Sequence, residues 1–228
     1  MYDLTVDKLA QFGLHRYEVS NFARSIPTQC KHNKGYWNGH DYIGLGPGAH
    51  SRFRPLNLNE RSQEIAAYTM RGKKPKFPLI KHNIRNARVQ TLEPEAWMRE
   101  VEVVGHGTRK IDYLSSEDVM SELLATSLRT EIGLTEKIWL QKLREICDSK
   151  EDMKDNATEL TLRSIIETDH KCDRFLENET LILDGENNLR LSKNGLKYLD
   201  HVLPYLISSL YKCMNNLSLQ TNGATKIA

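Results

Sequence analysis

The sequence contains few cysteines, and none of them lies near another. The 228 residues include four cysteines, Cys30, Cys147, Cys172 and Cys213, and no two fall within 20 residues of each other. Disulfide frameworks and structural zinc sites have characteristic cysteine spacings that this sequence lacks, so the pattern argues against both. The thiols are expected to be reduced, in an intracellular compartment.

The sequence also lacks a charge excess and a long apolar run. It has 32 Lys+Arg against 30 Asp+Glu, a net charge of +2, which argues against a dedicated nucleic-acid-binding protein. No apolar stretch approaches the length of a membrane span, so no transmembrane segment is expected. The beginning carries Asp3 and Asp7, whereas transit peptides are rich in Arg and poor in acids. On this criterion the chain shows no transit peptide and as it stands suits the cytoplasm.

Residues 17–51 carry most of the chemically informative side chains. Residues 17–20 and 42–45 are predicted to be short strands, and the second runs into Gly46, Pro47 and Gly48. Strands whose ends carry polar and glycine-rich residues are typical of a parallel α/β barrel, which binds ligands at that face. Soft ligands, imidazoles and flat aromatic rings are supplied by Cys30, His32, Tyr36, Trp37, His40 and His50. Residues 22–34 are predicted to be loop.

Hydrophobic periodicity and capping signals predict helices along the rest of the chain. The predicted helices cover residues 3–12, 60–71, 94–104, 116–130, 135–146, 160–166 and 192–203, and Pro204 is expected to bend or restart the last one toward residue 215. Residues 180–183 and 189–191 flank Asp-Gly-Glu-Asn-Asn, which predicts a β-hairpin. The pattern suggests four parts: 1–58 in a barrel, 59–92 as a connection, 93–215 as an α-rich winged-helix-like domain, and 216–228 as a disordered tail.

A basic stretch at residues 73–88 admits two interpretations. It includes Lys73, Lys74, Lys76, Arg85 and Arg88. Such a patch can attract a phosphate, a propionate or an acidic partner. A solvated linker between domains is the preferred interpretation, because prolines interrupt the stretch and no aromatic residues interleave with the charges.

Three segments together resemble a known family. YEVSNFA, HNKGYW and DYIGLGPGAHS occur in this order within residues 17–51. They resemble the HemW branch of the oxygen-independent coproporphyrinogen III oxidase family, which are radical S-adenosylmethionine (SAM) proteins and include heme chaperones. The run ARVQTLEPEAWMREVEVVGHGTRK at 87–110 is similar to the animal, mitochondrial branch. The resemblance implies the C-terminal part of a partial (β/α) radical SAM barrel followed by the winged-helix-like domain, in mitochondria.

The resemblance also implies binding residues. The His-Asn-x-x-Tyr-Trp hexad resembles the family's heme-binding motif and places heme at His32, Asn33, Tyr36 and Trp37. His32 is the expected iron ligand, with Cys30 as the alternative, and Lys31, Lys34 and Arg24 are near enough in sequence to meet propionates. A purely structural role, in which Tyr36 and Trp37 close the open side of the barrel, stays open. SAM is expected beside Gly46, Gly48, Ala49 and His50.

The sequence departs from the family at the iron–sulfur cluster. The family binds a 4Fe-4S cluster through Cys-x-x-x-Cys-x-x-Cys, because radical chemistry needs three thiolates on one cluster. The chain lacks this motif, so no cluster is expected here, no catalytic residue is assigned, and the chain is expected to be part of a longer protein. The favoured function is a heme-binding chaperone that delivers heme to acceptor proteins. The alternatives are a radical SAM coproporphyrinogen III oxidase-like enzyme, active only at full length, and a truncated product without activity.

Overall fold

The structure is a computed structural model, and it describes residues 1–55, 84–147 and 160–224. The chain divides into two compact units. The first unit combines Met1–His40 with Ser116–Ala228, and the second unit is Asp41–Ser115. This grouping differs from the boundaries at residues 58 and 92 that the sequence suggested, because the first 40 residues join the C-terminal helices.

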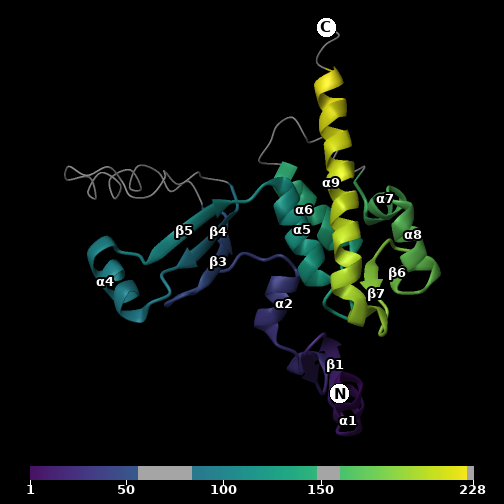
Figure 1. The fold of residues 1–228 in the computed structure, drawn as a ribbon, viewed down its shortest axis with the longest axis horizontal. Coiled ribbons are helices and arrows are strands. Elements are labelled where there is room, and N and C mark those ends of the chain that lie inside the picture. Colours follow the sequence, from purple (N-terminus) through teal and green to yellow (C-terminus); the bar gives the residue numbers. More distant parts are fainter. Residues whose placement is uncertain (56–83, 148–159, 225–228) are drawn as a thin grey trace. The chain divides into compact units, whose positions relative to one another are not determined.

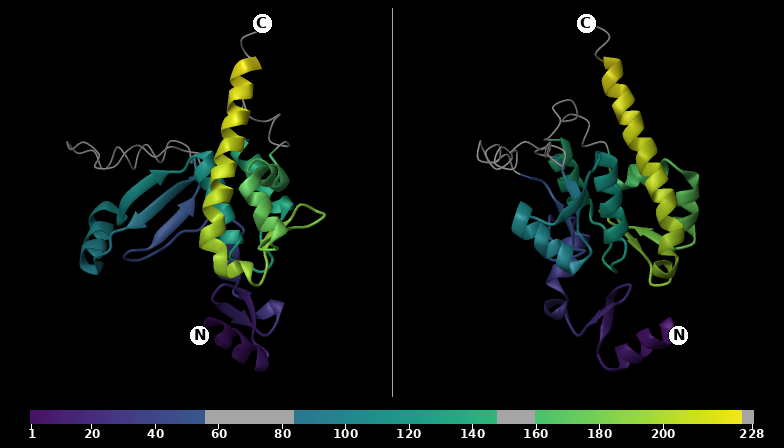
Figure 2. Two further views of the ribbon diagram at one scale, coloured as in Figure 1. Left: turned by 45° about the vertical axis from the view of Figure 1, so that its right-hand side comes forward. Right: turned by 60° about the vertical axis from the view of Figure 1, so that its left-hand side comes forward.

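Five helices build the larger part of the first unit. The long helix α9 packs against α5, α7 and α8, and the views in Figures 1 and 2 agree on this arrangement. Met120, Leu124, Trp139 and Leu206 are fully buried between them, and the indole Nε1 of Trp139 donates to the Leu160 carbonyl at 2.6 Å. The helices are α5 (Ser116–Ser127), α6 (Glu136–Cys147), α7 (Leu162–Glu167), α8 (His170–Glu177) and α9 (Leu199–Ala224).

A β-hairpin completes this α-rich part. Strands β6 (Leu181–Leu183) and β7 (Leu189–Leu191) pair antiparallel, as the Asp-Gly-Glu-Asn-Asn turn predicts. The Asp184 carboxylate closes the turn by accepting from the backbone N–H groups of Glu186 and Asn188, both at 2.9 Å. A short 3₁₀ segment, η3 (Gly195–Tyr198), then leads into α9. Helix α8 was not predicted, and α9 continues to Ala224, through most of the expected disordered tail.

The N-terminal residues form a small helix-and-hairpin layer of the first unit. Helix α1 (Tyr2–Gln11) matches the prediction. The predicted barrel strand at 17–20 is instead β1 (His15–Glu18), which pairs antiparallel with β2 (Asn21–Ala23) in a hairpin. The connection between them is too short for the crossover that parallel strands require. A 3₁₀ turn, η1 (Ile26–Thr28), follows.

The buried side chain of Arg16 links this layer to the rest of the first unit. Arg16, 8% exposed, donates to the Tyr2 hydroxyl at 2.9 Å, to the Glu131 carboxylate at 3.4 Å and to the Lys193 carbonyl at 3.4 Å. The backbone adds Val19 N–H to the Arg129 carbonyl at 3.1 Å. Segments that are distant in sequence therefore meet at β1.

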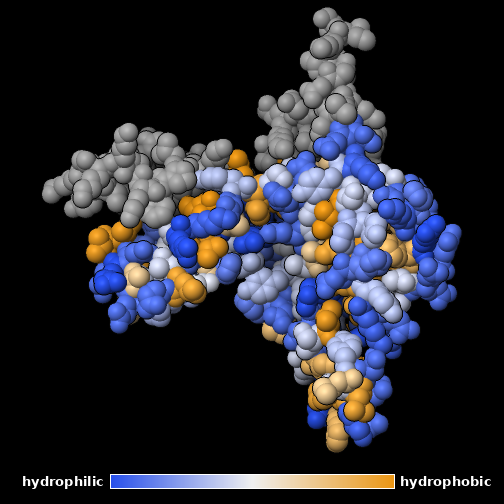
Figure 3. Space-filling model, viewed as in Figure 1, coloured by the Kyte–Doolittle hydropathy of each residue, from blue (hydrophilic) through white to orange (hydrophobic). Residues whose placement is uncertain are grey.

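Helix α1, by contrast, buries none of its own side chains completely. Leu4 and Phe12 are 62% and 68% exposed, and apolar surface is visible over the N-terminal segment in Figure 3. The beginning of the helix is held by the Tyr2 hydroxyl, which donates to the Val19 carbonyl at 2.6 Å, and by the ion pair of Asp3 with Lys197 at 2.6 Å.

The second unit is a three-stranded antiparallel sheet with one helix. The strand order is β3-β4-β5, with β3 at His50–Phe53, β4 at Asn86–Gln90 and β5 at Thr108–Tyr113. Helix α4 (Pro94–Val104) has the predicted bounds. The strand predicted at 42–45 is wrong, since only Tyr42 forms a bridge there, with Arg52. The linker interpretation is also wrong for Asn86–Gln90, which is the central strand.

Some predictions fall on residues outside the described ranges. The helix expected at 60–71 and the lysines at 73–76 are among them. Within the described residues, no helix combines the length and the apolar character needed to cross a membrane.

Candidate functional site

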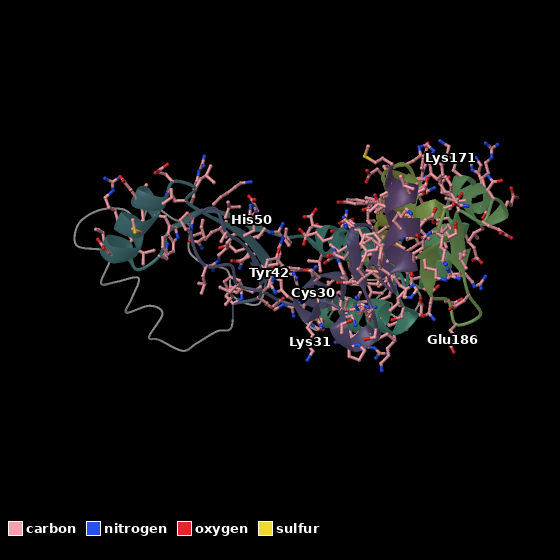
Figure 4. All side chains as sticks on the ribbon, turned by 90° about the horizontal axis from the view of Figure 1, so that it is seen from below. Cys30, Lys31, Tyr42, His50, Lys171 and Glu186 are labelled. Carbon is pink, nitrogen blue, oxygen red and sulfur yellow. The ribbon has the colours of Figure 1, made fainter. Side chains whose placement is uncertain are left out.

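The hexad HNKGYW forms a helix and not the predicted loop. Helix α2 covers Lys31–Trp37, and Cys30 precedes it as the N-cap residue. The Cys30 N–H donates to the Tyr17 hydroxyl at 3.2 Å, which fixes the start of the helix to strand β1. At the other end the His40 N–H donates to the Gly35 carbonyl at 2.9 Å, and Gly39 follows with φ +66°. Figure 4 shows Cys30 and Lys31 at the beginning of this helix.

The helical period places His32 and Tyr36 on one face of α2. Residues four apart in an α-helix lie one above the other. The two ring centroids are 4.6 Å apart with an interplanar angle of 77°, an edge-to-face contact. His32 is exposed and Tyr36 is half-buried. The imidazole therefore sits at the surface with one aromatic ring beside it.

Trp37 lies on a different side of the helix from His32. Each residue turns the helix by about 100°, so Trp37 and Asn33 share a face that His32 does not occupy. The Trp37 ring meets Tyr17 of β1 edge-to-face, with centroids 5.8 Å apart. The Ser127 hydroxyl of α5 donates to the Trp37 carbonyl at 2.5 Å. Trp37 thus anchors α2 to the first unit, and Tyr36 is the flat surface adjacent to His32.

The two lysines near the hexad lie on neighbouring positions of α2, because they are three residues apart. Lys31 is exposed and Lys34 is half-buried. Gly35 falls between Lys31 and the His32–Tyr36 pair. A Cβ added at Gly35 would lie 3.7 Å from His40 Nδ1, an ordinary van der Waals contact, so a methyl group fits at this half-buried position. Arg24 is exposed, before the helix begins.

The described cysteines do not form a cluster site. Cys30 is exposed, whereas Cys172 of α8 and Cys213 of α9 are buried. Burial raises the pKa of the Cys172 thiol, with Ser209 as its hydrogen-bonding neighbour at 3.8 Å. In the described part of the chain, no three His, Cys, Asp or Glu side chains come together in a way that could hold a metal ion. These residues do not fit an iron–sulfur cluster, which needs several converging thiolates.

The glycine-rich loop at residues 44–49 belongs to the second unit and leads into β3. Several of its amides are already hydrogen-bonded: Gly44 N–H to Ser51 Oγ at 3.0 Å, Gly48 N–H to the Thr91 carbonyl at 2.9 Å and Ala49 N–H to the Gly46 carbonyl at 3.2 Å. Glycine is required at Gly44, where an added Cβ would lie 2.2 Å from the His50 carbonyl oxygen. His50 is exposed at the first residue of β3, and Figure 4 shows it with Tyr42.

A buried carboxylate supports the strand that carries Tyr17. Glu18 is 2% exposed and accepts from Asn21 Nδ2 at 2.7 Å, Ser20 N–H at 2.9 Å and the Arg129 guanidinium at 2.9 Å. Burial alone would raise the pKa of Glu18, but these donors outweigh burial and hold the pKa below its ordinary value. Sequence reasoning missed both Glu18 and Tyr17 as supports of the site. The i, i+4 spacing of His32 with Tyr36 was an available signal for a helix.

The chain is similar in sequence to known mitochondrial proteins. No protein-family model matches it. The mitochondrial radical S-adenosyl methionine domain-containing protein 1 of Bos taurus is 36% identical over 202 residues, which are 89% of this chain and 37% of that protein. The Mus musculus protein of the same name is 35% identical over 210 residues, 92% of this chain and 39% of that protein. The chain therefore spans about two fifths of the length of these relatives.

Two further similarities point to the same group. The heme chaperone HemW of Bacillus subtilis is 44% identical over 50 residues, 22% of this chain and 13% of that protein. Among solved structures, the radical SAM enzyme coproporphyrinogen III oxidase (HemN) of Escherichia coli matches with a TM-score of 0.50 and 14% identity, over 90% of this chain and 39% of that one. This likeness concerns the fold and confirms the predicted partial α/β radical SAM fold. The chain belongs to the HemW-like family of radical SAM proteins.

Proposed function

We propose that the chain binds heme on the His32 face of α2 and passes it to an acceptor protein. One observation carries the proposal: an exposed imidazole stands edge-to-face against Tyr36 on a helix that is anchored from its other side. Imidazole nitrogen is a common axial donor to heme iron. The similarity to heme chaperone HemW of Bacillus subtilis supports the choice of cargo.

Five residues of the hexad, together with Lys31 before it, have roles in this proposal. His32 supplies the axial nitrogen, and Tyr36 supports the porphyrin edge. Gly35 leaves the helix surface open to a flat ligand, and Lys31 meets a propionate. Trp37, with Asn33 on its side of the helix, holds α2 in place by packing on Tyr17.

An exposed site suits delivery better than permanent storage. A ligand held by one axial bond at the surface can be approached by an acceptor protein from the open side. Cys30 is exposed at the N-cap of α2 and is the competing iron ligand. We further propose a mitochondrial location, as the names of the Bos taurus and Mus musculus relatives state for those proteins.

Radical enzyme chemistry is expected only in a longer protein that supplies the cluster cysteines. The described cysteines lie in separate elements and do not fit a cluster. We propose that Gly46, Gly48, Ala49 and His50 contact SAM only where the remainder of the radical SAM fold is present. Loop amides that are already hydrogen-bonded, such as that of Gly48, are then not the SAM donors.

Hemin titration of the purified chain, followed by visible absorption, tests the proposal. His32→Ala is expected to shift the Soret band and to weaken hemin binding at least about tenfold, since it removes the iron bond. His170→Ala is the matched control, because His170 has an 82% exposed side chain on α8 and has no part in the proposal. Cys30→Ser is expected to leave the spectrum unchanged. Equal binding by wild type and His32→Ala, or loss of the spectrum in Cys30→Ser, would show that His32 is not the ligand.

Transfer is tested separately from binding. The hemin-loaded chain is mixed with apomyoglobin, and the appearance of the myoglobin spectrum is followed in time. Transfer from the wild-type chain whose rate rises with the concentration of apomyoglobin supports delivery by direct contact between the two proteins. A rate that does not depend on the apomyoglobin concentration means that hemin simply dissociates, and argues for binding without a chaperone role.

A further inference from the structure

A fully buried amide with an unpaired donor and a half-buried guanidinium lie side by side on the central strand of the second unit. Asn86 and Arg88 are two residues apart on β4, so their side chains leave the sheet on the same face. Arg88 Nε donates to Asn86 Oδ1 at 3.0 Å. The register sets Phe53 and Tyr113 on either side of Asn86. This polar pair is therefore framed by two aromatic rings.

Arg88 is a half-buried guanidinium that lacks an anionic partner among the described residues. Arg16 and Arg85, the more deeply buried arginines, pair with the carboxylates of Glu131 and Asp41. Among the described residues, Arg88 contacts the Asn86 amide oxygen and the face of Phe53, whose ring centroid is 4.6 Å from its Cζ, and it lies near Tyr113. Burial lowers the pKa of Arg88, yet a guanidinium stays charged at any working pH. A desolvated charge ordinarily has a counter-charge.

The Asn86 amide adds a second donor that points to a ligand. Asn86 is completely buried, and its Nδ2 has no hydrogen-bond partner in the described structure. The orientation of the amide follows from Arg88, because Arg88 Nε can only donate and must therefore face the oxygen. A buried amide donor without an acceptor costs about 1–3 kcal/mol. Among the described residues, the Nδ2 of Asn86 therefore lacks the acceptor that a buried amide ordinarily has.

We propose that Arg88 and Asn86 form a binding site for a small carboxylate. A carboxylate has two acceptor oxygens and one negative charge, which match one guanidinium fork and one neutral amide. A phosphate, with more oxygens and more charge, would leave acceptors unmatched here. Arg88 is only half-buried, so the ligand is expected to bind beside its guanidinium, and the covered Nδ2 of Asn86 reaches the ligand after neighbouring side chains shift. The site is independent of the proposed heme function.

Nuclear magnetic resonance of the whole chain with sodium propionate as the probe tests the site directly. The Arg88 Nε–H and Asn86 side-chain amide signals are expected to shift saturably, at constant ionic strength set with sodium chloride. His106 provides an independent readout, since partial burial and the positive charge of Arg88 lower its pKa. A bound carboxylate offsets the charge of Arg88, so the pKa of His106 is expected to rise on saturation.

Three variants separate this site from general anion binding. Arg88→Gln is expected to weaken propionate binding at least about tenfold, whereas Arg109→Gln, at an exposed position of β5, leaves it unchanged. Asn86→Asp places a carboxylate beside Arg88, so it is expected to abolish binding and to raise the melting temperature. The proposal is overturned if chloride gives the same shifts, if phosphate binds more tightly than propionate, or if Arg88→Gln binds normally. A lowered melting temperature in Asn86→Asp also counts against it.

Discussion

Replacing Glu18 is expected to loosen the strand that positions α2. Glu18→Ala removes a carboxylate that is 3% exposed and accepts from Ser20, Asn21 and Arg129. A hydrogen bond to a charged group contributes about 1.5–3 kcal/mol, but the side chain of Arg129 is 42% exposed and can be hydrated after the change. We therefore expect a loss of about 3 kcal/mol in the free energy of unfolding, or roughly 6–12 °C in melting temperature.

Urea unfolding followed by circular dichroism measures this loss. Glu177→Ala is the matched control, because Glu177 is exposed on α8 and surface changes of this kind usually alter stability by less than about 0.5 kcal/mol. Glu18→Gln retains the shape and one acceptor oxygen, so an intermediate loss is expected. If Glu18→Ala unfolds with the same midpoint as Glu177→Ala, the hydrogen-bond network of Glu18 does not stabilise the first unit.

The dependence of stability on pH gives a second check on Glu18. Its pKa in the folded chain lies below the ordinary value of 4.5. The folded state therefore binds the proton less readily than the unfolded state, and the stabilisation is fully present above about pH 4.5. It is lost as the pH falls through the lowered folded value. Wild type is expected to lose more stability than Glu18→Gln on acidification through this range, and parallel curves would refute the argument.

Three other substitutions have defined expected outcomes. Gly35→Ala should stabilise α2 by up to about 1 kcal/mol in thermal unfolding yet weaken hemin binding, because the added methyl stands on the open helix surface; unchanged hemin affinity would contradict the proposed face. Trp37→Ala should cost about 2–3 kcal/mol in urea unfolding and leave the Soret position of the bound fraction unchanged. Gly133→Ala should cost more than about 2 kcal/mol, since Gly133 has φ +75° and the new Cβ would lie 2.2 Å from the Leu189 carbonyl oxygen; a neutral melting curve would contradict this.

The sequence predicted elements well where local signals decide the structure. Helix α4 has the predicted bounds, from its first-turn proline to the residue before Gly105, and the β6–β7 hairpin follows its turn residues. Strand pairing was predicted less well, because it depends on partners elsewhere in the chain. Residues 42–45 alternate with glycine and resemble a strand, but the sheet instead pairs β3 with β4, across a long sequence separation.

In the candidate heme site, the residues could be recognised from the sequence, but their arrangement depends on the fold. The hexad could be recognised from its residues, and its assignment as a heme site stays a prediction. That His32 and Tyr36 share a face follows from the helix, which the loop prediction at 22–34 excluded. The separate role of Trp37 depends on Tyr17 and Ser127, which are distant in the sequence. The position of Arg88 beside Asn86 likewise depends on strand β4, which lies where the sequence had predicted a linker.

Arg16 has a consequence for how the chain acquires its structure during synthesis. Its guanidinium joins Tyr2, Glu131 and Lys193, so three of its bonds involve segments that the ribosome makes at very different times. Chains emerge at roughly 5–20 residues per second, and Lys193 therefore follows Arg16 by on the order of ten seconds or more. Until Arg129 and Glu131 are made, the β1–β2 hairpin lacks the ion pairs of Glu18 and Arg16, and a two-stranded hairpin alone is only marginally stable in water. The helix that carries His32 is accordingly fixed only after these later residues have been made, although it is translated before them.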